Sequence, residues 1–128
     1  MSTENLWGSL DDFKKVKTPL SIIREQGELL TQATQGVLQG FVKIDSQADR
    51  INFSFFIVAP GLNNYKYEVL KVSHPITIYP VMVFNTVEEK QRWEECTHEL
   101  IFLSKIKSIL SSSKIKKVIE SLLSQSES

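Results

Sequence analysis

Four runs of alternating apolar residues constrain the fold of this chain more than any other feature. They span residues 37–44, 51–59, 65–73 and 76–84. An apolar residue at every second position is typical of a β-strand, whose successive side chains point to opposite faces. The segments between the runs are too short for the crossover that parallel strands require. We therefore predict a four-stranded antiparallel meander, with Pro80 placing the fourth strand at an edge or a bulge.

Helical patterns precede the strand runs. Thr18 followed by Pro19 is a typical helix start, and Gly36 is a typical residue just beyond a helix end. Between them, apolar residues recur at helical spacing, which predicts a helix to about Gln35. A shorter helix is predicted from Ser9 to Val16, because Ser9 is a favourable N-cap residue.

Helical patterns also follow the strand runs. Thr86 and Glu89 have the spacing of a capping box, which predicts a long helix from Thr86 to about Leu110. Residues 111–113 are serines that break this helix, and an amphipathic pattern then predicts a last helix through Leu123. The predicted class is α+β: a four-stranded antiparallel meander sheet preceded by one or two helices and followed by two C-terminal helices.

Length and charge limit the classes of partner. The 128 residues predict a single domain over 1–128, with fraying expected at about 1–8 and 124–128. Lysine plus arginine equals aspartate plus glutamate, at 15 each, so no general field draws in nucleic acid or an anionic membrane. The start lacks a signal-peptide pattern, and no apolar run approaches the roughly 18 residues that span a bilayer. We expect a cytoplasmic protein that binds neither nucleic acid nor membrane.

The sequence EECTHE, residues 94–99, holds the single cysteine and one of two histidines. If it lies on the predicted long helix, a rotation of about 100° per residue puts Cys96 in the apolar stripe and His98 almost opposite. Two groups on opposite sides of a helix cannot share a metal ion or form a catalytic pair. We therefore predict a buried, inert Cys96, with no metal site, no catalytic residue and no cofactor.

Five other residues are candidates for ligand binding. Gln26 is a polar residue in the middle of the first helix's apolar stripe, and a buried amide needs a hydrogen-bond partner or a cavity. An aromatic and histidine cluster is expected around the strand ends, formed by Tyr65, Tyr67, His74 and Tyr79. A structural role is the first interpretation for each, since strands are rich in tyrosine. The other interpretation is a pocket between the sheet and the first long helix.

A second sheet face is predicted to be apolar as well. Its members are Phe41, Phe56, Val58, Tyr79, Val81 and Val83. An antiparallel sheet with one solvated face alternates more cleanly than this. We therefore expect both faces to be covered, either by the C-terminal helices or by a second protein, and a homodimer is the first expectation.

Two functions are compatible with this pattern. The first is a non-enzymatic protein-interaction module of adaptor, chaperone-like or immunity type. The alternative is a small-molecule-binding domain or an enzyme. The lysines of residues 105–117 are expected to form a solvated face. The stretches TPLSIIREQ (18–26) and HPITIYPV (74–81) resemble parts of bacterial proteins, and this resemblance implies no particular family or activity.

Overall fold

The chain forms one antiparallel sheet whose five strands lie in chain order, as the computed structural model shows for residues 4–47 and 49–127. The strands are β1 (Gln39–Ile44), β2 (Arg50–Ala59), β3 (Tyr65–Pro75), β4 (Val81–Asn85) and β5 (Trp93–Cys96). The predicted α+β class and the antiparallel meander are confirmed, with a fifth strand added to the predicted four.

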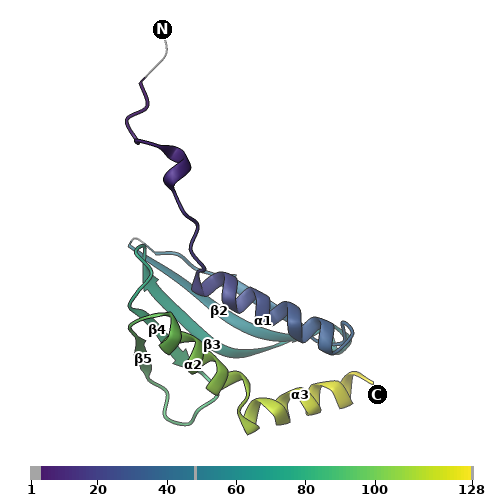
Figure 1. Ribbon diagram of the computed structural model, residues 1–128. Helices are drawn as coiled ribbons and strands as arrows, with labels where there is room; N and C mark the ends of the chain where they lie inside the picture. The colour runs from purple at the N-terminus through teal and green to yellow at the C-terminus, as the bar shows by residue number, and fades with distance from the viewer. Residues whose placement is uncertain (1–3, 48, 128) are drawn as a thin grey trace.

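Three α-helices flank this sheet within the described residues (Figure 1): α1 (Pro19–Ala33), α2 (Glu99–Leu110) and α3 (Ser113–Ser126). Thr18 caps α1 as predicted, because its hydroxyl accepts a hydrogen bond from the Ser21 amide at 3.1 Å. The short helix predicted from Ser9 is a single 3-10 turn, Leu10–Asp12. The sequence predicts fraying from residue 124, whereas α3 continues to Ser126.

The prediction of a long helix from Thr86 to about Leu110 is wrong. The chain turns after β4 and returns as β5, which pairs antiparallel with β4, and α2 begins only at Glu99. The Thr86 hydroxyl donates a hydrogen bond to the Glu68 carbonyl oxygen at 2.9 Å instead of capping a helix. Pairing with β4 satisfies the backbone groups of residues 93–96, and this tertiary contact outweighs their helical pattern.

The predicted fourth strand is also divided differently. Strand β3 continues to Pro75, and residues 76–80 form a turn that contains the cis Tyr79–Pro80 peptide bond. Strand β4 therefore starts at Val81. Its side chains alternate between the two sheet faces from that residue onward, with Val81 on the buried face. Val81 and Val83 are 0% exposed and face the helices, rather than lying on the second sheet face where the sequence analysis placed them.

The core lies between the sheet and the helices. One sheet face supplies Phe53, Phe55, Ile57, Leu70 and Val72, and the helices supply Ile22, Ile23, Phe102, Ile106, Ile109, Ile115 and Leu122. The side chains of the opposite face alternate with these residues, and apart from the buried Val58 those of β2 on this face are half-buried. Helices α1, α2 and α3 thus cover a single face and do not divide between the two, and cover of the other face by a second protein stays a prediction.

Helix α1 lies unusually close to strand β1. A Cβ atom built on Gly40 would overlap the Cα atom of Gly27, and one built on Gly27 would lie 3.3 Å from the Phe55 ring. The two glycines therefore let the helix and strand backbones touch. This contact fixes α1 over the β1–β2 end of the sheet.

Candidate functional site

Helix α3 borders the candidate site because its apolar stripe packs on the end of the β2–β3 hairpin. Ser112 begins the helix, its hydroxyl accepting a hydrogen bond from the Ile115 amide at 3.3 Å. Ile115 and Leu122 are buried at helical spacing, with Val118 half-buried between them. The polar residues beside this stripe therefore stand at the boundary between helix and sheet.

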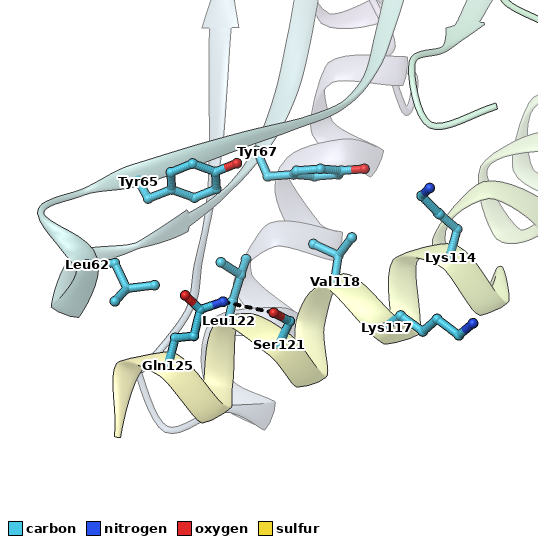
Figure 2. A pocket seen from close by; sticks show the side chains of 9 residues that line it. All are labelled: Leu62, Tyr65, Tyr67, Lys114, Lys117, Val118, Ser121, Leu122 and Gln125. Carbon is cyan, nitrogen blue, oxygen red and sulfur yellow. Dashed lines mark hydrogen bonds between the residues drawn. The ribbon is translucent and has the colours of Figure 1, made fainter. Parts of the chain in front are cut away.

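A groove of about 700 Å³ lies along this boundary, and we call it the α3 groove. Strand β3 and the turn before it supply one wall and α3 supplies the other (Figure 2). The lining residues are Leu62, Tyr65, Tyr67, Lys114, Lys117, Val118, Ser121, Leu122 and Gln125. Sites that bind small molecules or peptide side chains have a similar size and a similar apolar and aromatic lining.

The apolar floor of the groove is formed by two aromatic rings and two aliphatic side chains. Figure 2 shows Val118 and Leu122 pointing from α3 toward the rings of Tyr65 and Tyr67. Tyr65 is 51% exposed although its ring is apolar, so the groove is open to solvent on this side. Rings of this kind offer a large contact area with a hydroxyl at the edge for hydrogen bonding.

The polar rim of the groove carries positive charge. Lys114 and Lys117 are exposed, and neither forms an ion pair with any residue that the structure describes. Farther along α3, the Gln125 side chain donates a hydrogen bond to the Ser121 hydroxyl at 2.9 Å (Figure 2). An apolar floor beside free ammonium groups favours a ligand that carries both apolar groups and carboxylates.

Only two of the five predicted binding residues meet in this groove. Tyr65 and Tyr67 line it, being two residues apart on the same face of β3. Gln26 is half-buried and lines a separate depression of about 370 Å³, where α1 faces α2. Gln26 also lines a depression of about 260 Å³ bordered by α1, strand β2 and α3, and the tyrosines line neither of these two depressions.

His74 and Tyr79 lie away from the groove. His74 is 4% exposed, and its Nδ1 lies 2.7 Å from the Pro75 carbonyl oxygen, which satisfies one ring nitrogen inside the core. The Tyr79 hydroxyl is buried without a hydrogen-bond partner among the described residues. Burial raises the pKa of Tyr79, and the nearby Glu99 and Cys96 raise it further.

The predicted interface residues divide between the two sheet faces. Phe41 and Phe56 lie on the face without helices, their ring centroids 6.1 Å apart, and the Lys66 ammonium lies 4.7 Å from the Phe41 ring centroid. Val58 alternates onto this face but is only 7% exposed. Val81 and Val83 belong to the core on the other face. The Lys66 side chain covers part of the Phe41 ring, which is still 40% exposed.

The side chains of Cys96 and His98 point to different environments, as predicted, although neither residue lies within the long helix that the sequence predicts. Cys96 ends β5 with its side chain in the core, 1% exposed, while His98 is the exposed N-cap residue of α2. Burial raises the pKa of the Cys96 thiol, an effect that Lys105 opposes and Glu94 adds to. Lys105 and Glu94 form an ion pair of 2.8 Å beside it.

Sequence reasoning missed the part of the groove that α3 supplies. Lys114, Lys117, Ser121 and Gln125 recur at intervals of three and four residues, which places them along one side of the helix. That spacing was visible in the sequence, but it is equally typical of a solvated helix face. The tyrosines of the third predicted strand were the other visible signal. Only the fold shows that these tyrosines and the polar residues of α3 line the same groove.

Residues 4–47 and 49–127 hold neither a clustered set of metal ligands nor a membrane-spanning helix. In these ranges no group of three or more His, Cys, Asp or Glu side chains is placed to hold a metal ion. None of the helices there has the length and apolar character needed to cross a bilayer. Comparisons with protein-family models, with curated proteins and with solved structures find no match to this chain.

Proposed function

We propose that this protein is a non-enzymatic protein-interaction module that binds a segment of a partner polypeptide in the α3 groove. The observation that supports this function best is the composition of the groove, an apolar floor beside two unpaired lysines. Such a surface fits a short segment that carries large apolar side chains and acidic residues. This is the recognition mode of an apolar anchor with a charged rim.

The shape of the groove favours a polypeptide segment over an enclosed ligand. Tyr65, Lys114, Lys117, Ser121 and Gln125 are all exposed, so the groove is open along α3 rather than closed over. An open, elongated site buries the side chains of a segment while leaving its backbone at the surface. Binding would cover the tyrosine rings, which are favourable anchors because they lose little conformational entropy.

The test uses synthetic, fluorescently labelled peptides and fluorescence anisotropy. One peptide carries leucine and phenylalanine three positions apart with two aspartates between them, and the other carries lysines in place of the aspartates. We expect the acidic peptide to bind at least roughly tenfold more tightly, because the lysine rim favours carboxylates and repels ammonium groups.

A matched pair of variants locates the binding. The double substitution Lys114→Glu and Lys117→Glu reverses the charge of the rim, whereas Lys116→Glu reverses an exposed lysine of α3 that does not line the groove. Binding of the acidic peptide is expected to fall in the first variant and to persist in the second. Equal losses in both variants, or equal binding of both peptides, would refute the proposal.

A small amphiphilic carboxylate is a second candidate ligand. The volume of about 700 Å³ supports it, because it lies within the range of small-molecule sites. A ligand that binds only the folded state raises the thermal midpoint with its concentration. A midpoint that rises with medium-chain carboxylates, in a protein that binds neither peptide, would favour this candidate over the interaction module.

A further inference from the structure

The N-terminal arm, residues 4–16, carries apolar side chains that the rest of the described chain leaves uncovered. Each of its large apolar residues is more than half exposed, from 54% at Leu10 to 84% at Leu6: Leu6, Trp7, Leu10, Phe13 and Val16. Figure 1 shows the arm running away from the sheet and helices. Apolar surface concentrated on one short segment is a mark of an interaction site.

The arm also carries the acidic residues that suit the α3 groove. Asp11 and Asp12 lie between Leu10 and Phe13, within a single 3-10 turn that Phe13 directly follows. The two apolar residues are three positions apart, so one turn presents both on the same side. Lys14 and Lys15 follow, which limits the acidic and apolar part to residues 4–13. This part has the chemistry that the lysine rim and the tyrosine floor favour.

We propose that the N-terminal arm of one copy occupies the α3 groove of a second copy. Leu10 and Phe13 cover the tyrosine rings there, and Asp11 and Asp12 lie beside Lys114 and Lys117. Reciprocal exchange of two arms closes a two-fold dimer, a low-cost route to self-association. The inference rests on the proposed function, because it names the segment that fills the same groove.

The start of α1 directs the arm away from the groove of its own chain. Pro19 is buried, and the Ser21 hydroxyl accepts a hydrogen bond from the Thr18 amide at 3.1 Å. Thr18 is extended, with φ −99° and ψ 158°, so the chain leaves in a fixed direction. The groove lies at the other end of α1, beside the β2–β3 turn. To reach it, an arm would have to reverse at this capped start and run back about 20 Å along the helix.

Sedimentation equilibrium across micromolar concentrations tests whether the arm joins two copies. We expect the full chain to dimerise and the double variant Leu10→Ser, Phe13→Ser to dimerise at least roughly tenfold more weakly. Leu100→Ser is the matched control, since Leu100 is an exposed apolar residue of α2 outside the groove. A monomeric wild type, or a dimer that survives the arm substitutions unchanged, would overturn the inference.

A charge-reversal mixing experiment tests whether the contact is between chains. One variant carries Asp11→Lys and Asp12→Lys in its arm, and the other carries Lys114→Glu and Lys117→Glu in its groove. Each variant alone pairs like charges and is expected to be monomeric, whereas a mixture pairs opposite charges at both contacts. A mixture that dimerises supports exchange between copies. A mixture that stays monomeric while the wild type dimerises overturns it.

Peptide binding separates this inference from the proposed function. The acidic peptide is added to the Leu10→Ser, Phe13→Ser variant, whose groove is unchanged. We expect tighter peptide binding to this variant than to the wild type, because no arm competes for the groove. Equal binding to both proteins would overturn the arm as occupant and leave the proposed function standing. Absence of binding to either would overturn both.

Discussion

At the scale of the residue, burial controls the chemistry of Cys96. Its side chain lies in the core at the end of β5, and burial raises the pKa of the thiol by disfavouring the thiolate. Only the thiolate reacts quickly with alkylating reagents. Cys96 is therefore a core residue whose reactivity reports on the opening of the structure.

We expect native Cys96 to react at least roughly a hundredfold more slowly with iodoacetamide than the thiol of the protein unfolded in urea. Raising the pH should speed the unfolded thiol first, because the folded thiol titrates at higher pH. Mass spectrometry of time points measures both rates. Labelling of the folded protein at the unfolded rate would mean that β5 does not hold this side chain in the core.

Tyr79 gives a pH-dependent prediction. Its pKa is raised in the folded state, chiefly by burial, so the folded protein holds this proton more tightly than the unfolded chain does. The resulting stability is fully present below the unfolded pKa of about 10 and is lost as the pH rises through the folded pKa. Tyr79→Phe is expected to reduce the fall in unfolding free energy between pH 9 and 11, measured by urea titration. An unchanged pH slope would contradict it.

At the scale of the element, the two glycines between α1 and β1 determine how closely helix and strand approach. Gly40 has no room for a Cβ atom, because that atom would overlap the backbone of Gly27. Moving α1 outward to make room would also loosen Ile22 and Ile23, which are almost fully buried on the same helix. The position of the helix over the sheet therefore depends on these two small residues.

We expect Gly40→Ala to lower the free energy of unfolding by about 1–3 kcal/mol, the usual range for overpacking a core. Gly27→Ala should cost less, because alanine regains roughly 1 kcal/mol of helix propensity. Gln39→Ala, at an exposed neighbour in β1, is the control. Urea unfolding followed by circular dichroism measures all three, and equal stabilities for the wild type and Gly40→Ala would contradict the close approach.

The elements also show which parts of the fold the sequence could predict. Alternation along residues 51–59 predicted β2, and Thr18 with Pro19 predicted the start of α1, because each signal is local. Strand β5 was missed because residues 93–96 become a strand only by pairing with β4. The α3 groove was missed for a similar reason. Its tyrosines and lysines lie far apart in the chain, and only the packing of α3 against the β2–β3 turn brings them together.

At the scale of the whole molecule, α3 closes the core from one end. It packs against strand β2 and the turn before β3, although it is the last element of the chain. Ile115 and Leu122 are its buried residues, and each fully buried side chain of this kind contributes roughly 1.5–3 kcal/mol. The helix thus belongs to the folded body while also forming one wall of the groove.

Removing residues 113–128 is therefore expected to lower the thermal midpoint and to expose apolar surface that binds the dye ANS. Calorimetry and dye fluorescence measure the two effects. The single substitution Leu122→Ala removes only one buried side chain of this helix, and we expect it to lower the free energy of unfolding by about 2–4 kcal/mol. Lys116→Ala, at an exposed position of the same helix, should stay within about 0.5 kcal/mol of the wild type. An unchanged midpoint after truncation would show that α3 does not complete the core.

The order of the strands has a consequence for the rate of folding. Strands β1 to β5 each pair only with their neighbours in the chain, so the sheet can form from successive hairpins that close short loops. Helix α3 is the exception, because its contacts with β2 close a long loop, and we expect it to dock after the folding transition state. Stopped-flow kinetics should then show that Leu122→Ala speeds unfolding while leaving the folding rate almost unchanged. Leu70→Ala, in the central strand β3, should slow folding instead. The groove would then be the last part of the molecule to form and the first to open.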